Sequence, residues 1–390
     1  MNKDAITLTF TGDIGFDKYM KDSWRDDKVL DPAVKDFIKD SDHLIVNVEG
    51  PLYKKEESNG KTEGAASLVH SMDPGVGDFL SAIGADIWCI CNNHIMDAGT
   101  DGIKSTLDIA KDHGVKTVGA GMNIDEASSP VFFDEAGGIG IISVGYQRAC
   151  RKADDNTPGC FSWSDLALIE ERIKEIKKRC RWCIVIPHAG EEFTALPSPY
   201  TRERYISYLE MGADIVIAHH PHVVNNYEIF DKKSVFYSLG NFIFDTDYQR
   251  SQMYTQYGVI LKIRFSKDSF SFEPFGIMID RNTGTVVSHD ILPIFTDVCA
   301  AEYKKLKYLA AKVLIENTKR QLRYLRSAEF ENATEEDFKR DFYIPLRSGR
   351  VPGETLDMQI IYPLSQKYRY SDVERSPLKA VVEHMLSQIG

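Results

Sequence analysis

Side chains that can bind divalent metal ions recur between Asp13 and His222, each close behind a short apolar run. They are two carboxylates, an amide and three imidazoles: Asp13, Glu49, Asn93, His188, His220 and His222. Oxygen and imidazole ligands suit manganese, iron(II), zinc or magnesium, and the set contains no cysteine, which argues against a structural zinc site. We therefore predict a centre for two divalent metal ions that activates a water molecule for hydrolysis.

The histidine cluster at residues 219–222 is the strongest of these signals. Three of the ten histidines fall within these four positions, and Pro221 restricts the backbone between two of them. Packing alone would not favour this cluster, because each neutral imidazole carries polar atoms that need partners. Asp13 and Glu49, by contrast, each lie beside a glycine, and taken singly they are equally typical of turns.

Short apolar runs precede the predicted ligands. We expect buried strands at residues 5–10, 44–48, 86–91, 184–187 and 214–218. In open α/β sheets, ligands bind beyond the carboxyl ends of the parallel strands. The predicted strands would therefore bring the six side chains to one edge of the fold.

Helical patterns lie between these strands. Asp73 and Pro74 predict the start of a helix that runs to residue 82. Residues 102–113 and 201–211 predict two more helices, each followed by a glycine. Leu166 and three isoleucines repeat every three or four positions and predict an apolar helix face. Alternating strands and helices indicate an α/β fold.

The pattern changes after residue 220. Strands with few helices between them are predicted at residues 235–237, 258–265, 270–279 and 286–292, in an antiparallel meander. Residues 54–64 are polar and predict a surface loop. From residue 299 onward the composition becomes helical and charged. We therefore place one domain at residues 1–298 and a mostly helical extension at residues 299–390.

Composition restricts the classes of partner. The 390 residues carry a net charge of −11, which disfavours nucleic-acid binding and attachment to an anionic membrane. No apolar run approaches the roughly 20 residues of a membrane span, and no signal segment precedes the first predicted strand. We expect a cytoplasmic protein, although the sequence would also fit the trimmed form of an exported one. The expected substrate is an anionic small molecule or polymer.

The cysteines predict packing rather than chemistry. Their number, seven, is odd and fits reduced thiols better than a disulfide framework. Cys89 and Cys91 alternate with apolar residues in a predicted strand. Cys180 and Cys183 have the spacing of redox motifs, but they connect a predicted helix end to a strand start. We assign all four a structural role.

Blocks of the chain match, in order, a known family. They are Thr-Gly-Asp13, Asn47-Val-Glu49-Gly-Pro-Leu, Asn92-Asn-His94-Ile-Met-Asp97-Ala-Gly99, Val118-Gly-Ala-Gly121, His188-Ala-Gly-Glu-Glu192-Phe, Gly212-Ala-Asp-Ile-Val-Ile-Ala-His-His-Pro-His222 and Tyr237-Ser-Leu-Gly-Asn-Phe-Ile-Phe-Asp245. On these blocks the chain resembles the poly-γ-glutamate capsule biosynthesis (CapA-type) family of the calcineurin-like metallophosphoesterase superfamily. The resemblance covers residues 8–245 and does not extend to residues 299–390.

The resemblance implies a four-layer α-β-β-α sandwich with a dinuclear metal centre. Asn93, His188 and His220 would bind the second ion, Asp13 and His222 the first, and Glu49 would bridge the two. His94 would be the catalytic acid, with Asp97 to orient it. Asn92, Glu192 and Asn241 would bind substrate or support the metal-binding histidines.

One departure from the superfamily pattern concerns the first metal. The superfamily begins this site with Asp-x-His, but here Asp13 is followed by Ile14 and Gly15. We therefore expect a depleted first site, unless another side chain such as Asp17 completes it. The histidines outside the matching blocks are interpreted as structural or surface residues: His43, His70, His113, His289 and His384.

Two functions fit these residues. The first is a metal-dependent hydrolase, whose substrate is a phosphoester by analogy with the superfamily or a γ-glutamyl bond by analogy with the family. The second is a non-catalytic or weakly catalytic component of capsule synthesis that holds an anionic polymer. The missing histidine at Gly15 favours the second, and the lack of a membrane anchor favours the first. For residues 299–390, packing against the domain and an interaction module both remain open.

Overall fold

The computed structural model describes residues 5–54, 70–146, 150–190, 192–193, 197, 199–252, 254–290 and 295–297. The chain divides into two units. The first consists of Met1–Ala189 and Tyr205–Asp297 and contains every predicted site residue except Glu192. The second consists of Gly190–Arg204 and Val298–Gly390. The predicted helical extension at residues 299–390, with its boundary, lies outside the described residues.

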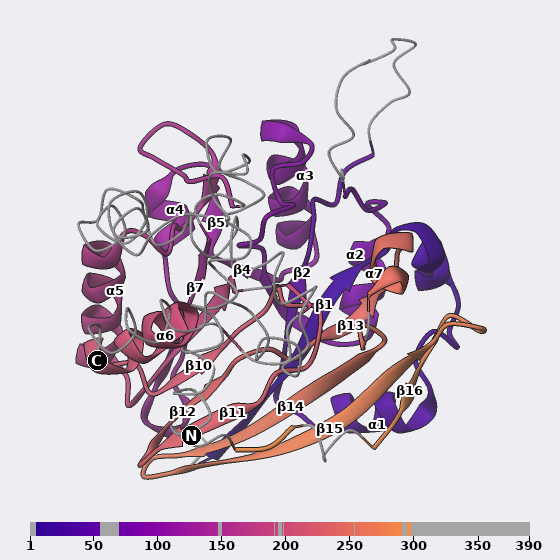
Figure 1. Cartoon of the computed structure of the whole chain (residues 1–390). Helices are drawn as coiled ribbons and strands as arrows, with labels where there is room; N and C mark the ends of the chain where they lie inside the picture. Colours follow the sequence, from indigo (N-terminus) through magenta and orange to yellow (C-terminus); the bar gives the residue numbers. More distant parts are fainter. Residues whose placement is uncertain are drawn as a thin grey trace, which may run out of the picture. The chain divides into compact units, whose positions relative to one another are not determined.

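The larger sheet of the first unit is mixed (Figure 1). Its strands follow the order β16-β15-β14-β1-β2-β3-β4, and β13 pairs with the far end of β1. Strands β1 to β4 and β13 run parallel, whereas β14, β15 and β16 form the predicted antiparallel meander. The bounds are β1 Ala5–Gly15, β2 His43–Val48, β3 Ala85–Cys89, β4 Lys116–Val118, β13 Asn241–Phe244, β14 Tyr257–Ser266, β15 Phe270–Asp280 and β16 Thr285–Ser288.

The second sheet has the order β11-β12-β10-β9-β7-β6. The meander predicted from residue 235 is wrong for its first strand, because β12 lies parallel to β10 in this sheet. A short ribbon of β5 and β8 stands apart from both sheets. The bounds are β5 Ala120–Gly121, β6 Val131–Phe133, β7 Ile139–Gly145, β8 Gly159–Cys160, β9 Trp182–His188, β10 Ile215–Ile217, β11 Tyr227–Phe230 and β12 Lys233–Phe236.

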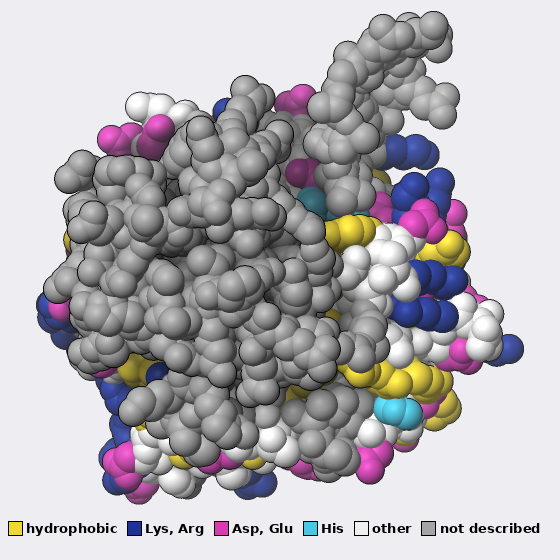
Figure 2. Space-filling view, in the orientation of Figure 1, with side chains coloured by type: hydrophobic (Ala, Val, Ile, Leu, Met, Phe, Trp, Pro, Cys, Tyr) yellow, Lys and Arg dark blue, Asp and Glu magenta, His cyan; other side chains and the backbone are white. Residues whose placement is uncertain are grey.

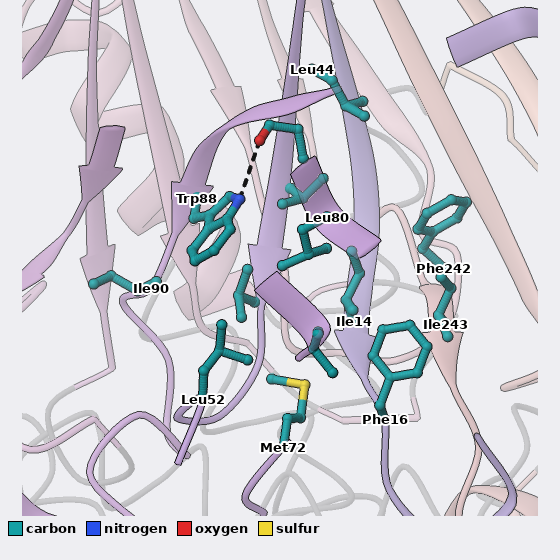
Figure 3. Close-up of a cluster of buried hydrophobic side chains, with 14 of the residues drawn as sticks. Ile14, Phe16, Leu44, Leu52, Met72, Leu80, Trp88, Ile90, Phe242 and Ile243 are labelled. Carbon is teal, nitrogen blue, oxygen red and sulfur yellow. Dashed lines mark hydrogen bonds between the residues drawn. The ribbon is translucent and has the colours of Figure 1, made fainter. Parts of the chain in front are cut away.

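Two apolar cores hold the layers together. One contains side chains from both sheets, including Phe10 of β1 and Ile184 of β9, so the sheets face each other across it. The other lies between the larger sheet and helices α1, α2 and α3. In Figure 3 this outer core includes Leu80 beside Trp88, whose indole Nε1 donates a hydrogen bond to the carbonyl of Ala85 at 3.3 Å. Helix α5 covers the second sheet at β7 and β9.

This arrangement is the α/β fold that the sequence predicts, with helices outside two facing sheets (Figure 1). Among the described residues, no helix is both long and apolar enough to cross a membrane. The helix bounds are α1 Pro32–Lys39, α2 Val76–Ala82, α3 Gly99–Asp112, α4 Ile124–Ser128, α5 Leu166–Arg179, α6 Pro199–Met211 and α7 Asp247–Ser251, with short 3₁₀ turns η1 Lys18–Met20, η2 Ser23–Arg25 and η3 Glu135–Gly137.

Local sequence explains most helix ends but not all. Helix α3 stops before Gly114, whose φ of +68° suits glycine, as predicted. Helix α2 begins at Val76 rather than at Pro74, because Asp73 accepts a hydrogen bond from the backbone of Gly75 in a preceding turn. Leu166 is 38% exposed, so the predicted apolar face of α5 begins only at Ile169. Leu166 is the first residue of this helix and lies beyond the sheet-facing stripe.

Backbone hydrogen bonds join the chain on either side of residues 54–69, and we call this junction the clamp. Tyr53 donates its N–H to the carbonyl of Met72 at 2.9 Å, and Met72 donates to the carbonyl of Pro51 at 2.9 Å. Leu52 and Met72 form a parallel β-bridge. The clamp places His70 near the end of strand β2, which Glu49 directly follows. Of the predicted loop at residues 54–64, only Lys54 is described.

The described surface carries charges of both signs. On the face shown in Figure 2, lysine and arginine side chains lie beside aspartate and glutamate. The described part of this face is therefore mixed in charge.

Candidate metal centre

Asp13 lies inside a strand rather than in a turn after it. Strand β1 was predicted to end at residue 10, but it continues to Gly15 because β13 pairs with its last residues. Asp13 stands in register with Asn241 of β13 and Asn47 of β2. A Cβ at Gly12 would lie 2.1 Å from the carbonyl oxygen of Gly240, so glycine permits this close approach of the two backbones.

The other predicted ligands follow the ends of neighbouring strands. Glu49 comes directly after β2, His188 is the last residue of β9, and Asn93 lies in the turn after β3. His220 and His222 follow β10. The two carboxylates are fully buried, and the three histidines are at most 3% exposed. The expected convergence of strand ends from both sheets therefore occurs.

The ligand atoms form two groups that share Glu49. Glu49, His188 and His220 each place a ligand atom within 4.8 Å of the others, and so do Asp13, Glu49 and His222. Glu49 Oε1 lies 3.6 Å from His188 Nε2 and 3.5 Å from His222 Nε2. Two ligands of one ion, each roughly 2.0–2.2 Å from it, stand about 3.0–3.6 Å apart. The two groups therefore fit a pair of ions with a common carboxylate.

Asn93 joins the second group. Its Oδ1 lies 2.8 Å from His188 Nε2, the same nitrogen that faces Glu49. His188 Nδ1 is buried and has no hydrogen-bond partner among the described residues. His188 Nε2, which lies beside an amide oxygen and a carboxylate oxygen, is therefore the nitrogen that would bind a divalent cation together with them.

The protonation states also suit metal binding. Burial alone would raise the pKa of the Asp13 carboxyl, but hydrogen bonds and charge interactions with His219 and His222 hold it well below its ordinary value. Burial, followed by the nearby His220, lowers the pKa of His188 well below its ordinary value. Ionised carboxylates and neutral imidazoles are the forms that bind metal ions.

Buried amides orient the first group. Asn47 Nδ2 donates to Asp13 Oδ1 at 2.8 Å, and His222 Nδ1 lies 2.9 Å from Asn241 Oδ1. Asn241 uses its amide nitrogen to donate to the carbonyl of Thr255 at 2.8 Å, so its oxygen accepts from His222. This fixes the proton on His222 Nδ1 and leaves Nε2, which faces Glu49, as the ligand atom.

The backbone is strained where the histidines cluster. His220 has a φ of +96° and His222 a φ of +56°, with Pro221 between them. Residues other than glycine rarely adopt this left-handed region, and each such residue costs about 1–3 kcal/mol. The surrounding strands must therefore hold both imidazoles in place, as is typical of binding sites.

Gly15, where the superfamily pattern has histidine, is filled by an aromatic ring. A Cβ at Gly15 would lie 2.2 Å from the ring of Phe244. Phe244 stacks on His222 with ring centroids 4.9 Å apart. Asp17, the suggested replacement, has its Oδ2 2.5 Å from His70 Nδ1 instead. The first group therefore consists of Asp13, Glu49 and His222. The phenyl ring of Phe244 packs against the imidazole of His222 in place of a fourth ligand.

Histidine at position 15 is expected to destabilise the protein rather than to restore a ligand. The Gly15→His side chain must displace Phe244, and overpacking of this kind costs about 1–3 kcal/mol. Thermal unfolding and metal analysis would show a lower Tm and no additional ion. A variant as stable as the parent, or one that binds more metal, would contradict the role of Phe244.

His94 and Asp97, the predicted acid and its orienting partner, form a pair directly after Asn93 in the chain. His94 Nδ1 is 2.7 Å from Asp97 Oδ2. Burial lowers the pKa of His94, and the hydrogen bond to Asp97 offsets this only in part. Asn92 supports the same turn: its Nδ2 donates to the carbonyl of Val48 at 2.7 Å, and its Oδ1 accepts from the backbone of His94 at 3.2 Å. Both amide atoms of Asn92 therefore hold the backbone in place.

Sequence reasoning missed three residues around the centre. His219 Nδ1 lies 3.1 Å from Asp13 Oδ1, and Asn47 donates to the same oxygen. Both residues lie in the blocks that match the family, and this location was the sequence signal that could have identified them. His70, interpreted as structural or surface, is 6% exposed and packs against His94. Glu192 belongs to the second unit, so its role at the centre stays a prediction.

Buried thiols support the turn that carries Asn93. Cys91 is 3.6 Å from the carbonyl of Phe161, Cys160 is 3.5 Å from that of Asn92, and Cys150 is 3.9 Å from that of His188. Cys89, Cys180 and Cys183 are buried and free as well, in agreement with the predicted packing role. Two of the three sulfur contacts thus reach the backbone of a predicted ligand, His188, or of the neighbour of one, Asn92.

Comparisons with known proteins place the chain in a family. A family model described as "Bacterial capsule synthesis protein PGA_cap" matches residues 7–246. The PGA biosynthesis protein CapA of Bacillus subtilis is 29% identical over 257 residues, which cover 64% of this chain and 66% of that protein. The capsule biosynthesis protein CapA of Bacillus anthracis is 28% identical, over 64% of this chain and 62% of that protein. The match thus spans slightly less than two thirds of either relative.

A solved structure shows a weaker likeness. The 5'-nucleotidase from Candida albicans aligns over 83% of this chain and 59% of that chain, at 12% identity and a TM-score of 0.39. A likeness at this level bears on neither the fold nor the activity of this protein.

Proposed function

Because the chain belongs to the PGA_cap family of bacterial capsule synthesis proteins, we propose that it is a metal-dependent hydrolase that acts in capsule polymer metabolism. One observation carries the proposal. Glu49 is common to two buried groups of ligand atoms, one with His188 and His220 and one with Asp13 and His222. A shared carboxylate of this kind is the arrangement that a pair of hydrolytic metal ions requires.

The residues have distinct tasks in this proposal. Two divalent ions, when bound, would lower the pKa of a water molecule between them and attract an anionic substrate. Asp13, Glu49, Asn93, His188, His220 and His222 would hold these ions. His94, whose Nδ1 is paired with Asp97, would act in its doubly protonated form and transfer the Nε2 proton to the leaving oxygen of the substrate. Asn241 keeps His222 in the tautomer that binds metal.

We propose a phosphoester as the substrate, because His94 protonates an oxygen leaving group and a dinuclear site neutralises the charge of a phosphoryl group. A γ-glutamyl bond is the alternative, supported by the name of the Bacillus subtilis relative, a PGA biosynthesis protein. Hydrolysis of phosphomonoester, phosphodiester and poly-γ-glutamate substrates by the metal-loaded protein would distinguish the two.

A non-catalytic polymer-binding component is the second candidate. The observation that favours it is the phenyl ring of Phe244 at Gly15, which leaves the first group with few ligands. In that case the protein would bind an anionic polymer and hydrolyse none of the three substrate types.

Removal of His220 provides the direct test. The His220→Ala variant is expected to lose one of two bound ions and about 10²-fold or more of hydrolytic activity, because His220 shares a ligand group with Glu49 and His188. Metal analysis of the purified protein measures the first effect. His289→Ala, which removes an exposed histidine outside the centre, is the matched control. Fewer than one bound ion in the parent protein, together with an unaltered variant, would refute the dinuclear enzyme.

A further inference from the structure

A second histidine–aspartate pair lies next to His94 and Asp97. His70 Nδ1 is 2.5 Å from Asp17 Oδ2, and the two side chains are 8% and 18% exposed. Asp17 follows β1, and His70 follows the strand end of β2 across the clamp. The resemblance to the family assigns no role to either residue, so the pair calls for its own explanation.

The two pairs are joined through one carboxylate oxygen. The backbone N–H of His70 donates to Asp97 Oδ2 at 2.8 Å, and His94 Nδ1 lies 2.7 Å from the same oxygen. The rings of His70 and His94 meet edge to face, with centroids 4.1 Å apart and planes at 80°. His70 therefore fixes Asp97 through its backbone and the plane of His94 through its ring.

Further contacts hold His70 itself in place. Its ring centroid lies 5.3 Å from that of Phe244, which also stacks on the ring of His222. Gly50, directly after Glu49, has a φ of +120°, and a Cβ there would lie 3.3 Å from the carbonyl oxygen of His70. The backbone of His70 thus packs against the residue that follows the shared metal-binding carboxylate.

We propose that the His70–Asp17 pair positions the acid His94 for proton delivery, so that Asp17, His70 and Asp97 together set the direction of His94 Nε2. This inference rests on the proposed hydrolytic function. The chain of contacts is continuous: Asp17 anchors the His70 ring, and this ring confines the His94 ring. The His70 backbone meanwhile anchors Asp97, which holds the proton on His94 Nδ1. His94 Nε2 makes no hydrogen bond within the described residues and is left to face the substrate.

Leaving-group dependence separates positioning from general stability. In the His70→Ala and Asp17→Ala variants, kcat for an alkyl phosphodiester should fall about 10–100-fold, as is typical when a supporting partner is lost. A dinitrophenyl phosphodiester needs no protonation of its leaving group, so its kcat should stay within about threefold. The His70→Asn variant keeps a donor for Asp17 and should recover part of the loss. Metal content should match the parent in all three.

His113→Asn is the matched control, because His113 and Asp78 form a histidine–aspartate pair with a 3.4 Å separation on the exposed side of α2 and α3. This control variant should have the kcat of the parent for both substrates. An equal loss for both substrates in the His70 and Asp17 variants would overturn the positioning role, and so would no loss for either.

Nitrogen NMR of histidine-labelled protein tests the same inference without turnover. In the parent, His94 should show the single tautomer with its proton on Nδ1, and in His70→Ala and Asp17→Ala it should show a mixture. An unchanged His94 tautomer in both variants would refute the inference. If the parent hydrolyses no substrate, the proposed function fails, and this NMR comparison still decides whether His70 and Asp17 orient His94.

Discussion

Glutamine in place of Glu49 is expected to abolish the binding of both metal ions and to reduce hydrolysis by about 10³-fold or more. Glu49 is the one residue common to the two ligand groups, and its Oε1 faces His188 on one side and His222 on the other. The amide of glutamine has no charge to offset two buried cations. Asp13→Asn should lose only the first ion and keep the second, because Asp13 belongs to the first group alone.

Metal analysis and thermal unfolding measure this result. In the parent, free metal at about 100 times its dissociation constant should stabilise the fold by roughly 2.7 kcal/mol, and Glu49→Gln should lose this response. Glu273→Gln, which alters an exposed glutamate on β15, serves as the control. Two ions retained by Glu49→Gln would show that the shared carboxylate is not the bridge.

Asparagine in place of His94 is expected to lower kcat by about 10²–10⁴-fold on substrates with poor leaving groups, while both metal ions stay bound. His94 lies outside the two ligand groups, and its Nδ1 is occupied by Asp97. The loss should shrink sharply for a dinitrophenyl leaving group, which departs without a proton. Asp97→Asn keeps the imidazole and should cost only about 10–100-fold.

Steady-state kinetics with the two substrates, alongside metal analysis, would check this assignment. The matched control is again His113→Asn, since His113 forms a comparable pair with Asp78 far from the ligand groups. Loss of metal from His94→Asn would instead make His94 a ligand, and an equal loss on both substrates would exclude it as the acid.

The sequence predicted which side chains converge better than it predicted the strands that carry them. Apolar runs ending in Glu49, His188 and His220 were sufficient, because parallel strands bring their carboxyl ends together. The end of β1 was not predictable in this way. Asp13 lies within the strand because β13, which is more than 200 residues away in sequence, pairs with it.

Contacts between distant segments explain the other differences. No strand is predicted at residues 139–145, although β7 is fully buried and lies between β9 and β6 in the second sheet. The ring of Phe244 fills the space at Gly15, and no local pattern at either position indicates this contact. His70 likewise carries no motif, and only the clamp brings it to His94.

The clamp between Leu52 and Met72 makes the candidate metal centre modular. It closes the chain on itself just before and just after residues 54–69, so Glu49 and His70 keep their positions whatever length of chain lies between. Loop insertions add little entropic cost once the ends are joined. The relative positions of Glu49 and His70, and with them the His70–His94 contact, are therefore expected to tolerate changes in the number of residues between the two sides of the clamp.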